Sequence, residues 1–137
     1  MDITPATTTA GLTELFGDPI STYTRTQAIE DGMLIDATEG DFAEVTRQHF
    51  GSVHVAMTSA LFELIKKAVE HPRHCNDWRG VWHDICWMSR VTVARGGGLF
   101  IVIIAGTGRI RNHILRVECG ATDEGAPALT YMLRDES

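Results

Sequence analysis

The sequence has neither an even set of cysteines nor a hydrophobic run long enough to cross a membrane. Its cysteines, Cys75, Cys86 and Cys119, are odd in number and show no paired spacing, whereas small secreted proteins normally carry an even disulfide framework. The longest apolar run, Leu99 to Ala105, covers seven residues, and a membrane helix needs about 20. The first residues also lack a positive segment followed by an apolar run, so no signal peptide is expected. We therefore predict a cytoplasmic protein without a membrane partner.

Repeats and strong compositional bias are also missing. Hydrophobic residues make up 44% and charged residues 22% of the chain, which is ordinary globular usage and argues against a disordered or fibrous class. A length of 137 residues suffices for one compact domain but not for two with separate cores. We expect a flexible, Thr-rich leader over residues 1–19 and a single domain over 20–137.

The first two thirds of the chain follow a mostly helical pattern. Capping residues and apolar spacing predict helices over residues 25–31, 41–49, 59–71 and 77–95, separated by short strands over 33–36 and 53–57. In the last helix, one broad apolar stripe includes Trp78, Trp82 and Ile85 and is expected to face the core.

After the glycines at 96–98 the pattern changes to that of strands. Segments 99–105, 113–119 and 129–133 are β-branched, apolar or alternating, and the short links between them favour hairpins. We predict an α+β fold in which these segments form a C-terminal antiparallel three-stranded meander. Two or three helices would pack on one face, and short N-terminal strands would join the sheet. The continuous apolar run 99–105 predicts a central strand that is buried on both sides.

No strong catalytic motif or cofactor-binding motif is present. Cys86 lies three residues after His83 on a predicted helix, so a thiolate nucleophile with an adjacent base is conceivable. However, Cys86 is surrounded by apolar residues in the sequence, and burial makes a thiol unreactive. We therefore predict a protein that is not an enzyme and needs no cofactor, and we rank a cysteine-dependent enzyme last.

A second polar cluster raises the question of a metal. His71, His74 and Cys75 are suitable zinc ligands, but no second ligand pair completes a tetrahedral set. A polar loop between two helices is the favoured interpretation, and the sequence leaves metal binding at these three residues open.

Charge is distributed unevenly along the chain. The net charge is −6, but residues 1–46 contain nine carboxylates and one base, Arg25, which gives this third a charge of −8. Helix capping explains only part of this excess, since Glu30 and Asp31 lie at a helix C-terminus, where the helix dipole disfavours anions. An acidic face attracts a basic partner. The candidate partner-binding residues are Tyr23, Glu30, Asp31, Asp36, Glu39, Asp41 and Trp87, the last because it lies off the core stripe of its helix.

The segment from Arg90 to Arg116 is locally basic, with five arginines and no acid. The candidate nucleic-acid-binding residues are Arg95, Arg109, Arg111 and Arg116. The nearby glycines do not match a phosphate-binding loop. The low overall pI and the scarcity of aromatics on these strands make nucleic-acid binding the alternative rather than the leading hypothesis.

The segment YTRTQAIEDGMLID, residues 23–36, resembles the opening of a family of small bacterial, plasmid and phage proteins of unknown function. The resemblance continues at VAMT (55–58), WHDICWM (82–88), VECG (117–120) and YML (131–133). His83 departs from the usual pattern of this family. The resemblance implies an accessory role on a mobile element, such as inhibition of host defence.

Together these observations predict a non-enzymatic accessory protein whose acidic face binds a basic protein partner. The most concrete version is an anti-CRISPR or anti-restriction inhibitor that binds a defence nuclease complex. The alternative is a small nucleic-acid-binding regulator that uses the arginines of residues 90–116. The sequence leaves a homodimer open.

Overall fold

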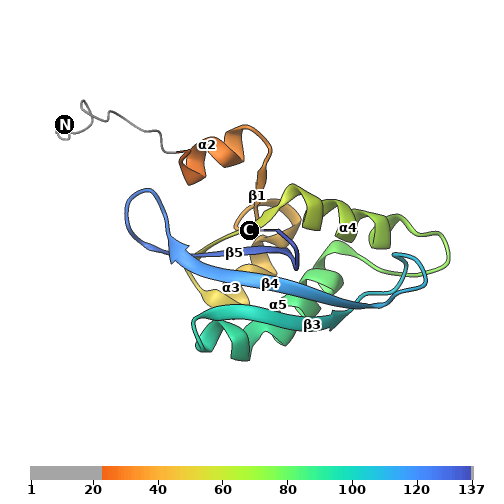
Figure 1. The fold of residues 1–137 in the computed structure, drawn as a ribbon. Helices are drawn as coiled ribbons and strands as arrows, with labels where there is room; N and C mark the ends of the chain where they lie inside the picture. Colours follow the sequence, from red (N-terminus) through yellow and green to blue (C-terminus); the bar gives the residue numbers. More distant parts are fainter. Residues whose placement is uncertain (1–22, 137) are drawn as a thin grey trace, which may run out of the picture.

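The computed structural model describes residues 23–136, so the predicted leader over 1–19 lies outside the described residues. The elements follow one another along the chain as shown in Figure 1. They are α2 (Arg25–Glu30), β1 (Leu34–Asp36), the 3-10 turn η1 (Gly40–Phe42), α3 (Ala43–Phe50), β2 (His54–Thr58), α4 (Ser59–Glu70), α5 (Trp78–Ala94), β3 (Gly97–Ile103), β4 (Asn112–Ala121) and β5 (Pro127–Leu133).

The strands form one five-stranded sheet in the order β1-β2-β5-β4-β3. Strands β3, β4 and β5 are the predicted antiparallel meander, and β1 pairs antiparallel with β2. Strand β2 runs parallel to β5, and this pairing joins the two N-terminal strands to the meander. The α+β class is thus confirmed. Strand β5 is the third of the five and is therefore the central strand.

The prediction that residues 99–105 form the central, doubly buried strand is wrong. This segment forms most of β3, which lies at an edge of the sheet. Phe100 and Val102 are buried, but Leu99, Ile101 and Ile103 point to the opposite face and are exposed. An unbroken apolar run shows only that both faces of a strand are apolar, and here one of those faces is open.

Three helix starts agree with capping residues in the sequence, but the predicted cap at Asp41 is wrong. Asp41 lies within η1, and α3 begins at Ala43 without a side-chain cap. Thr24 forms a capping box with Gln27 at the start of α2. Thr58 accepts a hydrogen bond from Leu61 N–H at the start of α4, and Asp77 caps α5 through Gly80 N–H. These side chains satisfy backbone donors that the first turn of a helix leaves unpaired.

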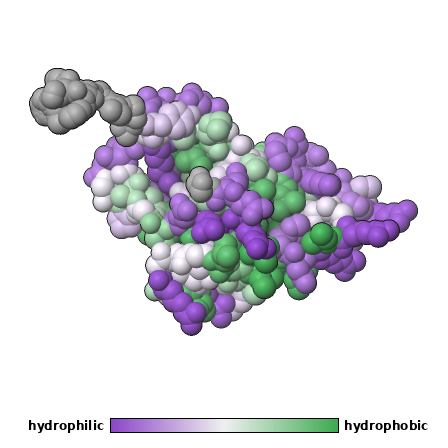
Figure 2. Space-filling model, viewed as in Figure 1, coloured by the Kyte–Doolittle hydropathy of each residue, from purple (hydrophilic) through white to green (hydrophobic). Residues whose placement is uncertain are grey.

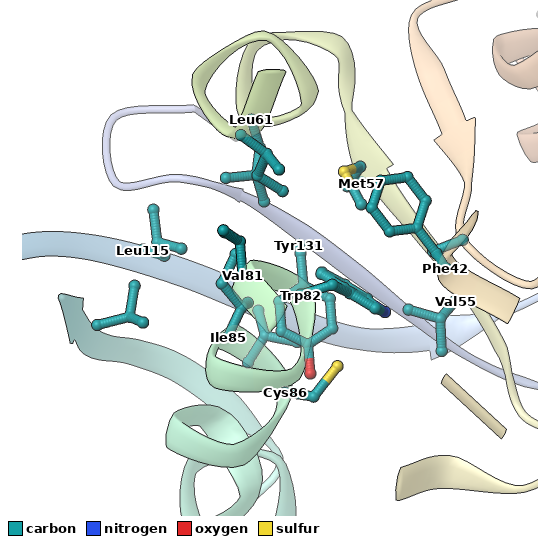
Figure 3. Close-up of a cluster of buried hydrophobic side chains, with 14 of the residues drawn as sticks. Phe42, Val55, Met57, Leu61, Val81, Trp82, Ile85, Cys86, Leu115 and Tyr131 are labelled. Carbon is teal, nitrogen blue, oxygen red and sulfur yellow. The ribbon is translucent and has the colours of Figure 1, made fainter. Parts of the chain in front are cut away.

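The hydrophobic core lies between the sheet and helices α3, α4 and α5 (Figures 1 and 3). The ring of Trp82 meets the ring of Tyr131 edge to face, with centroids 5.1 Å apart. Polar atoms in this core are paired: Trp82 Nε1 donates to Thr46 Oγ1 at 2.9 Å, and Thr46 Oγ1 donates to Ala37 O at 2.6 Å. Since both side chains are almost completely buried, this chain of bonds fixes α5 against the segment after β1.

Candidate functional site

A hollow of about 370 Å³ opens beside β1, at the sheet edge opposite β3. Three of its lining residues are carboxylates from the predicted acidic face: Asp36 at the end of β1, Glu39 before η1, and Asp41 within η1. The structure therefore brings together three of the candidate partner-binding residues. Their placement follows from the short link between β1 and η1, which turns the chain around the edge of the sheet.

The other side of this hollow is aromatic. Its lining includes Phe42, Phe62 of α4 and Trp78 of α5. The rings of Phe62 and Trp78 are stacked, with centroids 5.2 Å apart and planes inclined by 20°, and Phe42 meets Trp78 edge to face at 5.6 Å. Phe62 and Trp78 are only partly buried. We call this hollow, with its three carboxylates and three rings, the acidic hollow.

The carboxylate of Asp36 is fixed by neighbouring residues of the same chain. Its Oδ1 accepts hydrogen bonds from the backbone N–H of Thr38, at 2.8 Å, and from the Thr38 hydroxyl. Its Oδ2 lies 3.4 Å from His54 Nε2. Burial raises the pKa of Asp36, but the bonds from Thr38 and the neighbouring His54 outweigh burial and bring the pKa below its ordinary value. Asp36 is therefore ionised at neutral pH, and both of its carboxylate oxygens are engaged by Thr38 and His54.

Glu39 and Asp41 differ from Asp36 in being exposed. Within residues 23–136, no hydrogen bond or ion pair is found for either carboxylate. Glu44, which follows on α3, is by contrast paired with Arg79 at 2.9 Å. Glu39 and Asp41 are thus the carboxylates of the acidic hollow that are available to an external cation.

The remaining acidic candidates lie elsewhere. Glu30 and Asp31 are exposed at the end of α2 and do not line the acidic hollow. Tyr23 donates its hydroxyl to Asp31 Oδ2 at 2.6 Å, and this bond to a carboxylate raises the pKa of the tyrosine. The structure therefore divides the predicted acidic face into the acidic hollow and a separate pair of carboxylates on α2.

Trp87 is exposed, with 49% of its surface accessible, but it lies far from the acidic residues. It is nine residues, about 13 Å along α5, from Trp78 in the acidic hollow. The guanidinium of Arg90 lies 3.8 Å from its ring centroid, and the ring of His83 stacks on it at 6.4 Å. Trp87 therefore belongs to a different surface from Glu39 and Asp41.

The four candidate arginines do not form one ridge. Arg95 caps the end of α5, just before β3, whereas Arg109 and Arg111 lie in the loop after β3. The seven residues of β3 separate the two ends by about 20 Å. Arg116 lies on β4 opposite Leu99 and is half-buried. Exposed apolar side chains of β3 lie between these charges, so the structure gives no continuous basic track.

The candidate nucleophile is poorly suited to its role. Cys86 is completely buried in the core, and burial raises its thiol pKa far above the ordinary value, which disfavours the thiolate. His83, in contrast, is half-exposed at the surface. The geometry therefore does not support Cys86 as an activated thiol.

His71 and His74 lie with ring centroids 4.7 Å apart, and Cys75 is exposed. No group of three or more histidine, cysteine or carboxylate side chains that could hold a metal is found between residues 23 and 136.

In the same part of the chain, none of the helices has the length and apolar character needed to span a membrane.

Sequence reasoning identified the carboxylates of the acidic hollow but missed its aromatic side. Phe42, Phe62 and Trp78 come from three different elements, and each falls on the apolar face of its helix, where a core position is the natural prediction. Only the packing of η1 against α4 and α5 shows that their ring edges also border a surface hollow. No local signal in the sequence distinguishes this from complete burial.

Comparisons with protein-family models, with curated proteins and with solved structures gave no match to this chain. The resemblance of residues 23–36 and the later segments to a family found on mobile elements therefore stays a prediction.

Proposed function

We propose that this chain is a non-enzymatic binding protein whose acidic hollow receives a lysine or arginine side chain of a basic protein partner. The observation that supports this most strongly is the pairing of carboxylates with partly exposed, stacked rings in one hollow. The alkyl stem of a basic side chain packs well on aromatic rings. Its cationic head is attracted both by the ring faces and by Glu39 and Asp41.

The resemblance to proteins of mobile elements supports a role for this binding in the cytoplasm of a host cell. The most concrete version is inhibition of a defence nuclease complex of the CRISPR or restriction type, whose nucleic-acid-binding surface is basic. A protein with an acidic docking site competes with nucleic acid for such a surface.

The binding step is tested with a lysine- and arginine-rich peptide that contains no aromatic residue, titrated into the full chain by calorimetry. Exposed ion pairs contribute about 0.2–1 kcal/mol each, so the variant Glu39→Gln/Asp41→Asn should weaken binding by about tenfold. The matched control is Glu63→Gln/Glu70→Gln, which removes two exposed carboxylates of α4 and should leave the affinity unchanged. Equal weakening by both variants would show that only net charge matters and would refute a specific hollow.

The biological step is tested by expressing the chain in a host with an active restriction or CRISPR system and measuring the plating efficiency of a targeted phage. The wild-type chain should raise plating, and Glu39→Lys/Asp41→Lys should not. A wild-type chain that has no effect on plating would refute defence inhibition while leaving the peptide result to decide the docking site. A gel shift with labelled DNA or RNA that weakens steeply with salt would instead support the arginine-based alternative.

A further inference from the structure

Among residues 23–136, nothing protects the outer edge of β3 against pairing with another strand. Strand β3 lies at the end of the sheet, and its sequence, GGLFIVI, contains neither a charge nor a proline. Natural proteins normally protect such an edge with charged residues, prolines or a covering segment. In the described part of the chain, no strand lies beyond β3. The edge therefore presents a row of backbone donors and acceptors.

The hydrogen bond after β3 shows which backbone groups point outward. Ile104 N–H donates to Arg111 O at 2.9 Å, so residue 104 forms a hydrogen-bonded pair with β4. Along an antiparallel strand, the residues that bond to a given neighbour alternate. The even-numbered residues of β3 therefore bond to β4, and the N–H and C=O groups of residues 97, 99, 101 and 103 point away from the sheet. Leu99 O receives only a long contact, 3.4 Å, from the hydroxyl of Thr92.

The side chains next to this edge are apolar and exposed. Leu99, Ile101 and Ile103 lie on the open face of the sheet. Ile114 of β4, which is paired with Ile101, lies on the same face. The exposed fractions of Ile101 and Ile103 are 54% and 65%. Figure 2 shows hydrophobic surface over β3 and β4 in the lower part of the view. Unlike isolated surface hydrophobics, contiguous apolar patches mark interaction sites.

Helix α5 extends this apolar surface below the edge. Asp84, Met88, Val91 and Arg95 recur at helical spacing and form one exposed stripe. A groove of about 430 Å³ lies between this stripe and β3, and its lining includes Met88, Trp87 and Ile101–Ile103. We call this combination of the β3 edge and the α5 stripe the β3–α5 surface.

We propose that the β3–α5 surface binds a second copy of this chain, so that two β3 strands pair antiparallel around a twofold axis through Phe100. Phe100 is the midpoint of β3. In this register Leu99 pairs with Ile101 of the second copy and Gly97 with Ile103, so every outward-pointing backbone group meets another. The two sheets become one continuous ten-stranded sheet. The contact is isologous, which is the commonest way in which identical chains associate.

The charges on α5 favour a second copy over another partner. Thr92 lies against Leu99, and Met88 shares the groove with Ile101, so the part of α5 beside Phe100 lies between Met88 and Thr92. The same twofold axis therefore sets the two α5 helices antiparallel. It places Met88 against Val91 of the second copy and Asp84 against Arg95. The surface is thus complementary in charge to itself.

This inference is independent of the acidic hollow, which borders β1 at the other edge of the sheet. A dimer built through β3 leaves both acidic hollows accessible.

The mass of the full chain in solution, measured by light scattering or sedimentation over a range of concentrations, tests the proposal. The wild-type chain should have twice the monomer mass of 15.1 kDa, and Ile101→Lys should be monomeric because it places a charge on each side of the axis. The control Ile110→Lys changes an equally apolar and exposed residue in the loop after β3 and should stay dimeric. A monomeric wild-type chain would overturn the proposal, whether the edge is covered by residues 1–22 or by a strand of another protein.

The charge pair gives a second test that does not depend on the folding of the Ile101 variant. Asp84→Arg and Arg95→Asp each place like charges together across the axis, and each should weaken dimerisation by about tenfold. The combined variant Asp84→Arg/Arg95→Asp restores opposite charges and should recover the wild-type affinity. A combined variant that dimerises no better than either single variant would show that these residues do not meet, and would refute the proposed axis.

Discussion

The Nε–H of Arg25 donates to His54 Nδ1 across 2.9 Å. The terminal nitrogens of the same guanidinium donate to Thr130 Oγ1 at 2.6 Å and to Leu129 O at 2.7 Å. Because His54 Nδ1 accepts this bond, the ring hydrogen lies on Nε2, which faces Asp36 at 3.4 Å. Arg25 thus attaches α2 to β2 and β5 on the face of the sheet opposite the core.

Replacement of Arg25 by lysine should destabilise the fold although the charge is kept. A single ammonium cannot reproduce the planar fork that reaches three acceptors at once. Loss of about two charge-assisted hydrogen bonds should lower the free energy of unfolding by about 2–3 kcal/mol, measured by urea denaturation. Arg109→Lys, in an exposed loop, is the control and should change it little. Equal stability of the two variants would show that the hydrogen bonds of Arg25 do not stabilise the attachment of α2 to the sheet.

The structure also predicts acid sensitivity around α2. Asp123 accepts bonds from the Thr26 hydroxyl and from the backbone N–H groups of Thr26 and Arg25, and these bonds lower its pKa. The pKa of Asp36 is also lowered, as described above. Carboxylates with a depressed folded-state pKa stabilise the fold fully above the unfolded value, about 3.9, and lose this contribution as the pH falls through the folded value.

The free energy of unfolding should therefore decrease as the pH falls from about 5 toward 3. In Asp36→Asn/Asp123→Asn this decrease should be smaller, because two of the groups that take up protons on unfolding are gone. Urea denaturation at a series of pH values measures both slopes. A variant slope as steep as that of the wild type would contradict the assignment to these two carboxylates.

Thr46 supplies a buried hydrogen-bond relay that a shape-conserving substitution removes. In Thr46→Val, both Trp82 Nε1–H and Ala37 C=O lose their partner, and each unsatisfied buried group is costly. The free energy of unfolding should fall by about 2–3 kcal/mol. Thr46→Ser keeps the hydroxyl, loses one methyl group, and should cost only about 1 kcal/mol. If serine were as destabilising as valine, packing rather than hydrogen bonding would be the function of Thr46.

The elements themselves could be predicted because their signals are local. Thr24, Thr58 and Asp77 mark helix starts by side-chain chemistry that acts within four residues, and the change of period after Gly98 marks the strands. The order of the strands could not be predicted in this way. Pairing of β2 with β5 joins residues more than 70 positions apart, and no local pattern encodes it.

The error at residues 99–105 has the same origin. Apolar side chains on both faces predict burial on both faces only if something covers them, and coverage depends on which strand lies at the edge. The acidic residues show what composition alone cannot predict. Composition predicted an acidic face, but only the fold shows that Asp36 is engaged by Thr38 and His54, whereas Glu39 and Asp41 are open to a partner.

Gly97, at the start of β3, is required by its surroundings as well as by its backbone. Its φ is +107°, in the region that favours glycine. A Cβ atom there would lie 2.8 Å from the backbone oxygen of Val117, in the neighbouring strand, and a paired backbone oxygen cannot move aside. Gly108 is a matched comparison, since its φ is +124° but a Cβ would meet nothing within 4 Å.

Gly97→Ala should therefore be clearly more destabilising than Gly108→Ala. Both variants carry the backbone strain of a non-glycine residue at positive φ, about 1–3 kcal/mol. Only Gly97→Ala adds a collision that must separate β3 from β4, so we expect it to lower the free energy of unfolding by about 1–2 kcal/mol more. Urea denaturation of both variants at the same protein concentration measures the difference. Equal losses would mean that β3 shifts without cost at its start, and that the close approach to Val117 does not constrain the register of the edge strand.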